Sequence, residues 1–242
     1  MDRYIRQTAL NQVSEEDQET LRSKKVLIIG LGGLGGLTSS LLARAGVGHL
    51  TLIDTDKVEL SNLHRLFELN EEDLGKSKAE ATARKLRKIN QETKIDVHNE
   101  NFNVDNGERL VQEADVVIDG TDNLLTRFLI NKVSVKRNTP WVYGACVGTV
   151  GTSFTFVPKK TPCLSCMIPK KPICTPECEE VGIMNTVPPV VSSHQVTQAI
   201  KLMMGKETLK KLFYFDLWKN KFQLVTVNKK EDCPICGNET ED

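Results

Sequence analysis

The sequence has no excess of charge of either sign and no long uninterrupted apolar run. Its 242 residues include 32 lysines and arginines and 32 aspartates and glutamates. It therefore lacks the basic excess of a nucleic-acid-binding surface and the acidic excess of a solvating tail. Every apolar stretch is interrupted by glycine or charge well short of the ~20 residues that cross a bilayer. We expect neither a nucleic-acid partner nor a membrane.

The start of the chain and its composition indicate the broad class. Residues 1–6 are charged and lack the apolar core of a secretory signal. Hydrophobic residues make up 39% of the chain, which is ample for a sizeable core. We therefore expect a cytoplasmic protein with one large α/β domain over residues 1–242.

Short apolar runs alternate with helix-forming segments in the first part of the sequence. Continuous apolar runs are typical of strands that are buried on both faces, and they predict strands at 26–29, 50–54, 116–118 and 141–143. Helices are expected between them, at 37–45, 78–89 and 128–135. This alternation predicts a Rossmann-like, doubly wound sheet that is mainly parallel, with right-handed crossovers.

The pattern changes after Gly148 and divides the domain into two halves. Segments 152–157 and 213–227 have period-two character and predict antiparallel strands within residues 149–242. Four prolines interrupt residues 161–180, so an exposed loop is expected there. A helix is expected over 190–204. The other half, residues 1–148, carries the nucleotide-binding motifs.

A glycine-rich turn follows the first predicted strand. Gly30-Leu31-Gly32-Gly33-Leu34-Gly35 fits G-x-G-x-x-G between a strand and a helix, which is the context that this phosphate-binding motif requires. Without Cβ atoms, backbone N–H groups can approach phosphates, and the helix N-terminus favours their negative charge. Asp54 ends the next strand, where a carboxylate can accept hydrogen bonds from ribose hydroxyls. The motif suits NAD as well as ATP, so an NAD-dependent oxidoreductase stays open.

Further motifs make one family resemblance specific. Arg3-Tyr4-Ile5-Arg6-Gln7, the glycine turn, Ser61-Asn62-Leu63-His64-Arg65 and Thr121-Asp122-Asn123 follow one another in this order. With them the chain resembles the ThiF/MoeB/HesA family over nearly its whole length. That family is similar to the adenylation domain of ubiquitin-activating enzymes. The resemblance implies an adenylyltransferase that uses ATP.

The resemblance also implies which residues bind the nucleotide. Gly32 and its neighbours are implied to hold the phosphates, and Asp54, with Asp56 beside it, to hold the ribose. The residues implied to bind the polyphosphate are Asn62, Arg65 and Lys78. Lys76 is the alternative to Lys78 for this role.

Catalytic roles follow from the same resemblance. Asp122 is implied to hold Mg²⁺, an ion that requires hard oxygen ligands, and Asp119 is the alternative ligand. Arg6 is implied to reach the partner's ATP across a homodimer interface. Independently of the family, the reaction needs Arg, Lys and Mg²⁺ to stabilise negative charge, because a carboxylate attacks the α-phosphate of ATP and pyrophosphate leaves. One preorganised charged group is worth on the order of 3 kcal/mol in such a transition state.

Two C-x-x-C pairs predict a metal site. Cys163-Leu164-Ser165-Cys166 and Cys233-Pro234-Ile235-Cys236 have the spacing of zinc knuckles. Four thiolates can close a tetrahedral Zn²⁺ site without an open position, and such a site is structural. A thioredoxin-like redox role is the weaker interpretation, because neither pair opens a helix after a first strand. The predicted zinc pins the polar C-terminal tail to the loop after residue 157.

The three remaining cysteines are Cys146, Cys174 and Cys178. The segment that starts at Cys178 resembles the part of the family that holds a cysteine; in thiamine-pathway members this cysteine forms a covalent sulfur link with the activated carrier. A thiolate in a loop broken by prolines suits a nucleophile. Cys174 is the rival for this catalytic role, an inert thiol is the alternative, and Cys146 is expected in the core.

Together these features predict an enzyme. It is expected to transfer the AMP part of ATP to the C-terminal glycine carboxylate of a small ubiquitin-like sulfur carrier of thiamine or molybdopterin type. The products are an acyl-adenylate and pyrophosphate. The carrier's Gly-Gly end is expected to reach the site while the carrier docks on residues 149–242. A separate protein is expected to donate sulfur. The oxidoreductase and a zinc-stabilised scaffold that binds a ubiquitin-like partner without catalysis are the alternatives.

Overall fold

The computed structural model describes residues 3–168 and 182–237. Its strands join one eight-stranded sheet. Five strands run parallel: β1 (Lys25–Ile29), β2 (His49–Ile53), β3 (Lys94–His98), β4 (Val116–Asp119) and β5 (Trp141–Val147). Three antiparallel strands extend it: β6 (Val150–Phe156), β7 (Leu212–Asp216) and β8 (Lys221–Val225). The order across the sheet is β3-β2-β1-β4-β5-β6-β7-β8.

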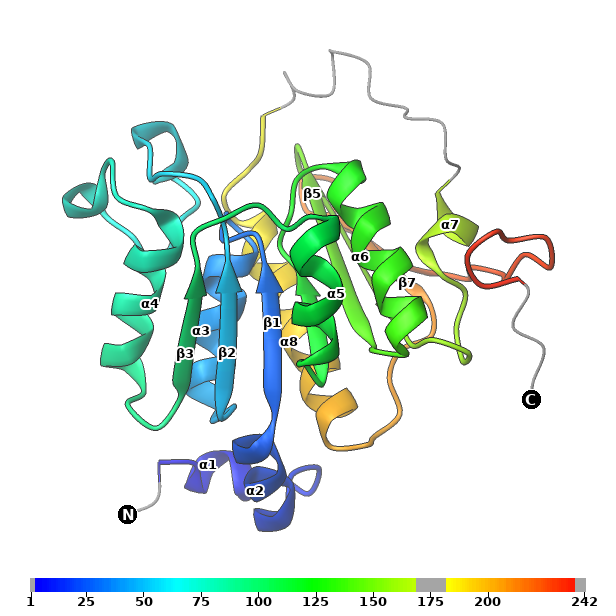
Figure 1. Cartoon of the computed structure of the whole chain (residues 1–242), viewed down its shortest axis with the longest axis horizontal. Coiled ribbons are helices and arrows are strands. Elements are labelled where there is room, and N and C mark those ends of the chain that lie inside the picture. Colours follow the sequence, from blue (N-terminus) through cyan, green and yellow to red (C-terminus); the bar gives the residue numbers. More distant parts are fainter. Residues whose placement is uncertain (1–2, 169–181, 238–242) are drawn as a thin grey trace.

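Helices cover both faces of the parallel strands (Figure 1). One face carries α3 (Gly35–Ala45), α4 (Lys78–Ile89) and α8 (Val187–Met203); the other carries α5 (Val104–Gln112) and α6 (Leu124–Arg137). The short elements are α1 (Ile5–Thr8), α2 (Glu15–Ser23), α7 (Leu164–Met167) and the 3₁₀ turns η1 (Leu60–Asn62) and η2 (Glu71–Asp73). The predicted Rossmann-like, doubly wound fold with antiparallel C-terminal strands is confirmed. Within the described ranges, every helix falls short of the length and apolarity needed to span a bilayer.

The continuous apolar run of β1 reflects its central position in the sheet. Val26 and Ile28 pack with α3, α4 and α8, whereas Leu27 and Ile29 pack with α5 and α6. All four side chains are at most 2% exposed. A strand with helices on both faces has no solvent side, so its apolar residues follow one another without alternation.

The strand order reverses between β1 and β4. The crossovers through α3 and α4 lead away from β1 on one face, and the chain returns through α5 and α6 on the other. Loops that leave the C-terminal ends of these two strands therefore diverge and leave a crevice, the usual place for a ligand in an open α/β sheet. The topology thus positions the candidate site before any side chain is considered.

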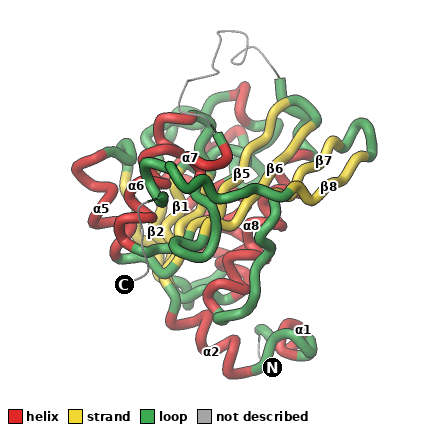
Figure 2. Tube along the Cα trace, turned by 90° about the vertical axis from the view of Figure 1, so that its right-hand side faces the viewer, coloured by secondary structure: helices red, strands yellow, loops and turns green. Residues whose placement is uncertain are grey.

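The sequence patterns did not predict β3 and α5. β3 is an edge strand in which Ile95 and Val97, which pack on the core, alternate with polar residues, so it lacks a continuous apolar run. α5 contains Asn106 and Gly107, which are poor helix formers. Gly107 is required there because a Cβ would lie 2.9 Å from the ring of Phe102. Segment 213–227, predicted to form antiparallel strand, forms the β7–β8 hairpin seen in Figure 2.

The start of α3 allows a direct test of backbone packing. A Cβ on Gly35 would lie 1.8 Å from the carbonyl oxygen of Gly30. We therefore expect Gly35→Ala to lower the free energy of unfolding by roughly 3 kcal/mol, because the backbone of the turn must move. Urea unfolding followed by circular dichroism measures this.

Gly36→Ala is the matched control in the same helical turn. Its Cβ would meet only Leu31 O, at 3.5 Å, which is ordinary contact. Alanine is favoured over glycine in a helix by roughly 0.5–1 kcal/mol, so this variant should be neutral or stabilised. Equal urea midpoints for the two variants would show that Gly35 is not constrained as described.

Candidate nucleotide site and cysteine cluster

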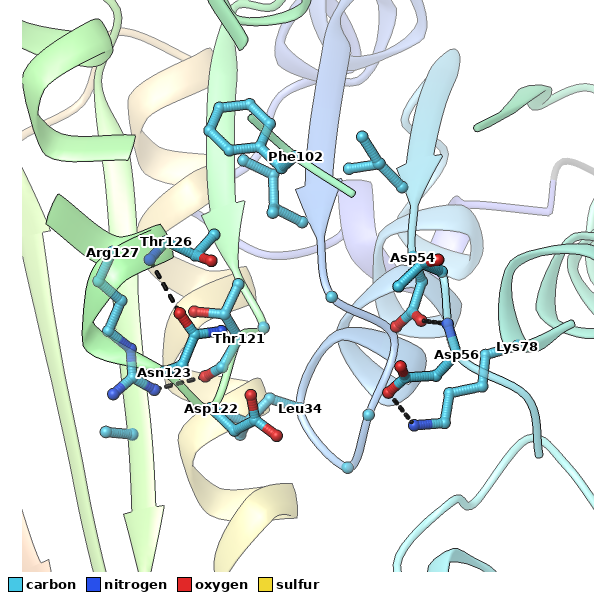
Figure 3. Close-up of a pocket in the computed structure, with 18 of the residues that line it drawn as sticks. Leu34, Asp54, Asp56, Lys78, Phe102, Thr121, Asp122, Asn123, Thr126 and Arg127 are labelled. Atoms are coloured by element: carbon cyan, nitrogen blue, oxygen red, sulfur yellow. Dashed lines mark hydrogen bonds and ion pairs between the residues drawn. The ribbon is translucent and has the colours of Figure 1, made fainter. Parts of the chain in front are cut away.

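A pocket lies at the C-terminal ends of β1, β2 and β4 (Figure 3). Most of the residues predicted to bind nucleotide or metal line it: Gly30, Gly32, Gly33, Leu34, Asp54, Asp56, Arg65, Lys78 and Asp122. Gly35 and Asn62 do not line it. In Figure 3 the glycine turn runs through the middle, with Asp54, Asp56 and Lys78 on one side and Thr121–Asn123 on the other. The fold therefore gathers five separate segments of the sequence around one opening.

The glycine turn is shaped by contact with the end of β4. Gly30 has a φ of +82°, a conformation that favours glycine, and a Cβ there would lie 2.8 Å from Gly120 O. A Cβ on Gly32 would meet nothing within 4 Å. The backbone of the turn therefore packs tightly against the end of β4, whereas Gly32 faces free space. An anion can approach the backbone N–H groups at the start of α3 from this open side.

Asp54 fixes the glycine turn to the end of β2. Its carboxylate accepts hydrogen bonds from the backbone N–H groups of Leu31, at 2.6 Å, and Asp56, at 2.7 Å. Burial raises the pKa of Asp54 above its ordinary value, and these hydrogen bonds act in the opposite direction. Each carboxylate oxygen can accept a second hydrogen bond. Asp54 is therefore suited to bind a ribose hydroxyl while it holds the turn.

Two of the predicted cationic side chains line the pocket. Lys78, the first residue of α4, is 8% exposed, and its Nζ lies 2.9 Å from Asp56 Oδ2. Arg65 follows η1, and its Nη1 donates to Ser61 O at 3.1 Å. The alternative residue Lys76 does not line the pocket and donates to Glu72 O instead. The geometry therefore favours Lys78 as the phosphate-binding lysine.

Asp119 and Asp122 differ completely in environment. Asp119 is fully buried, and its carboxylate accepts from Thr121 N at 2.9 Å, Thr121 Oγ1 at 2.6 Å and Arg127 Nε at 3.1 Å. Asp122 is exposed, and Figure 3 shows its carboxylate on the side of the glycine turn, away from Arg127. Both oxygens of Asp119 are already engaged within the protein. Asp122 is the carboxylate that can reach an ion in the pocket.

Arg127 is a pocket residue that the sequence analysis missed. It is buried on the first turn of α6, donates to the carbonyl oxygens of Thr121 and Gly144, and lies over the ring of Tyr143. Burial alone would lower the pKa of Arg127, but Asp119, Tyr143 and Asp122 together more than offset this and raise it above its ordinary value. Arginines are common in helices, so only the fold distinguishes this one.

Arg6 and Cys146 were also singled out in the sequence, and the structure places them at opposite ends of the sheet. Arg6 lies exposed in α1, at the opposite end of the sheet from the pocket of its own chain (Figure 1). Cys146, expected in the core, is half-buried at the end of β5 and lines the pocket, and burial raises the pKa of its thiol to about 12. Cys174 and Cys178 lie outside the described residues.

The four knuckle cysteines form one cluster, and all of their sulfur atoms lie within 4.8 Å of one another. Each residue is at most 6% exposed. The Sγ–Sγ distances are 3.6 Å for Cys163 and Cys233 and 3.5 Å for Cys166 and Cys236. Tetrahedral Zn²⁺ with Zn–S bonds of about 2.3 Å places sulfur atoms about 3.8 Å apart. Donor type, number and spacing therefore fit a structural zinc ion.

The fold and the pocket define a nucleotide-binding α/β protein with cationic groups and an open carboxylate beside a glycine turn. This is the arrangement expected of an enzyme that handles a polyphosphate. Residues 4–235 match the ThiF family, and the chain belongs to this family.

Comparison with known proteins supports the same assignment. The chain is 38% identical over 239 residues to the sulfur carrier protein ThiS adenylyltransferase of Bacillus subtilis (strain 168), which covers 97% of this chain and 71% of that protein. It is 34% identical over 248 residues to the sulfur carrier protein adenylyltransferase of Thermus thermophilus, covering 99% of this chain and 92% of that protein. The crystal structure of E. coli MccB with ATP has a TM-score of 0.86 and 27% identity, over 98% of this chain and 75% of that one.

These findings confirm the predicted family and show that the chain is an enzyme, an adenylyltransferase. The oxidoreductase and the non-catalytic scaffold are thereby set aside. The glycine turn, which suits either nucleotide, could not make this distinction by itself.

The buried pair of Asp119 and Arg127 gives a testable stability difference. Asp119→Asn leaves the Arg127 guanidinium buried without a charged partner, so the free energy of unfolding should fall by about 3–5 kcal/mol. The exposed Asp122→Asn should change it by less than about 0.5 kcal/mol. Urea unfolding at neutral pH measures both. Similar midpoints for the two variants would contradict a structural role for Asp119.

Proposed function

We propose that this enzyme transfers AMP from ATP to the C-terminal carboxylate of a small ubiquitin-like sulfur-carrier protein and releases pyrophosphate. The observation that carries the proposal is the pocket, where Arg65, Lys78 and Asp122 surround the open side of the glycine turn. Relatives over nearly the whole chain are named as adenylyltransferases of sulfur carriers. The thiocarboxylate that follows serves thiamine or molybdopterin synthesis in this proposal.

The described side chains suit the binding of a triphosphate. The N–H groups at the start of α3 and the open face of Gly32 receive phosphate oxygens. Lys78 is oriented by Asp56 at 2.9 Å, so little side-chain freedom is lost when its ammonium group contacts a phosphate. Arg65 can bind a phosphate bidentately, which lysine cannot do. Together these groups balance the negative charge that otherwise repels an incoming carboxylate.

The reaction needs positioning and charge stabilisation more than proton transfer. A carboxylate oxygen of the carrier forms a bond to the α-phosphorus of ATP while the bond from that phosphorus to the pyrophosphate oxygen breaks. The attacking carboxylate is already ionised near neutral pH, so no general base is required. Asp122 is the proposed ligand of Mg²⁺, which neutralises charge on the phosphates when bound.

The carrier is proposed to dock on residues 149–242 and to thread its Gly-Gly end into the pocket. The β7–β8 hairpin exposes large apolar side chains: Trp218, Phe222 and Leu224 are 74%, 59% and 54% exposed. An exposed apolar patch of this kind marks a surface for a protein partner. The division into a nucleotide-binding half (1–148) and a carrier-docking half (149–242) of one domain rests on this placement.

Three further assignments belong to the proposal. The four-cysteine cluster holds structural Zn²⁺ and joins the segment after Cys233 to α7. Cys178, or its rival Cys174, forms the covalent sulfur link with the carrier. A separate protein donates the sulfur.

Pyrophosphate exchange tests the proposed reaction directly. With a purified carrier protein that ends in Gly-Gly, the wild type should incorporate labelled pyrophosphate into ATP, and mass spectrometry should detect the carrier's acyl-adenylate. Asp122→Ala should reduce exchange by at least about 100-fold without loss of folding, because one charge-stabilising group is removed. Asp105→Ala, at an exposed position of α5 outside the pocket, is the matched control. Wild-type exchange rates in a folded Asp122→Ala protein would refute the metal assignment.

The proposed role of Arg6 requires a homodimer in which each α1 serves the partner's pocket. An Arg6→Ala protein and an Asp122→Ala protein, each inactive alone, should regain exchange activity when mixed and allowed to reassociate. The reason is that a heterodimer contains one pocket with both groups intact. No recovery in heterodimers confirmed by native mass spectrometry would place Arg6 outside the site.

A further inference from the structure

The cysteine cluster packs against one face of α6. Val135 of this helix is partly buried against the four cysteines. Asn131, one turn earlier on the same face, is fully buried. Its Oδ1 accepts a hydrogen bond of 2.8 Å from the backbone N–H of Leu164, which lies between the first two cysteines of the cluster. The helix and the knuckle are thus joined by a buried polar contact.

The other half of the Asn131 amide has no hydrogen-bond partner among the described residues. Its Nδ2 is buried without an acceptor that meets normal hydrogen-bond geometry. A buried donor without an acceptor lowers the free energy of unfolding by about 1–3 kcal/mol. The amide oxygen already binds the backbone of Leu164, the residue directly after Cys163, and the same helix packs on the cysteine cluster. A cysteine sulfur at this junction becomes a good acceptor only as a thiolate.

We propose that Asn131 is a positioning residue of the metal site, which donates its Nδ2–H to the Cys163 thiolate when a metal ion is bound. The inference rests on the proposed zinc site and extends it beyond the four ligands. A neutral thiol is a weak acceptor, whereas a metal-bound thiolate accepts a hydrogen bond well. Donors of this kind orient metal ligands and are needed for full metal affinity.

The same contact ties the metal site to the wall of the nucleotide pocket. Arg127, Asn131 and Val135 are spaced by four residues and lie along one stripe of α6. The stripe is about 12 Å long and runs from a residue that lines the pocket to one that packs on the cysteines. Metal binding therefore fixes the helix whose first turn holds the Thr121–Asn123 loop.

Metal release tests this assignment without ATP or carrier. The purified, reduced wild-type protein should contain about one equivalent of zinc, and release to a chromogenic chelator is then followed by stopped-flow absorbance. Asn131→Asp keeps the acceptor oxygen and the volume but removes the donor, and Asn131→Leu removes both. Both variants should release zinc 10–100-fold faster than the wild type. Ile130→Val is the control on the same helix, packed on the sheet away from the cysteines, and should match the wild type.

The outcomes distinguish the role of Asn131 from the presence of zinc itself. Wild-type release rates in both Asn131 variants would overturn the role of Asn131 while leaving the zinc site intact. Less than half an equivalent of zinc in the wild type would overturn both. If the variants do not fold, the ¹¹³Cd-loaded wild type replaces them. A scalar coupling between ¹¹³Cd and an Asn131 Nδ2 proton then supports the hydrogen bond, and its absence in an assigned spectrum overturns it.

Discussion

The close approach of three glycine backbones at the switch point of the sheet governs this structure. Gly30, Gly35 and Gly120 meet there, and a Cβ on Gly120 would lie 2.4 Å from Gly30 O. Only this contact lets α3 begin directly at the end of β1 and against the end of β4. The glycine turn before α3 then lines the crevice that the strand order opens. The position of the candidate phosphate site is thus a consequence of backbone packing before any charged side chain contributes.

Burial sorts the charged side chains around this crevice into two kinds. Asp54 and Asp119 are held by backbone N–H groups or by Arg127, and they fix the two loops in place. Asp122 and Lys78 remain oriented toward the pocket, the first exposed and the second held by a single carboxylate. Asp119 contributes to stability alone, Asp54 holds its loop and still lines the pocket, and Asp122 and Lys78 can meet a ligand.

Helix α6 stands between the two candidate sites. Asn123 caps its N-terminus by accepting from Thr126 N at 2.9 Å, which holds the pocket loop. Asn131 holds the knuckle at the middle of the same helix. A rigid helix transmits a constraint along its axis better than a loop does, because every residue is fixed by i to i−4 hydrogen bonds. The same helix therefore contacts both the pocket loop and the cysteine segment.

The sequence alone determined the family, the parallel core and most of the pocket, because these depend on local order. A buried central strand such as β1 needs a continuous apolar run, a tight turn needs glycines, and a metal knuckle needs cysteines at fixed spacing. Only the tertiary structure separates residues of one type: Asp122 and Lys78 line the pocket, whereas Asp119 and Lys76 do not. It also revealed Arg127 and Asn131, whose roles come from what α6 packs against. Burial and facing partners decide such roles, and neither is written in the neighbouring sequence.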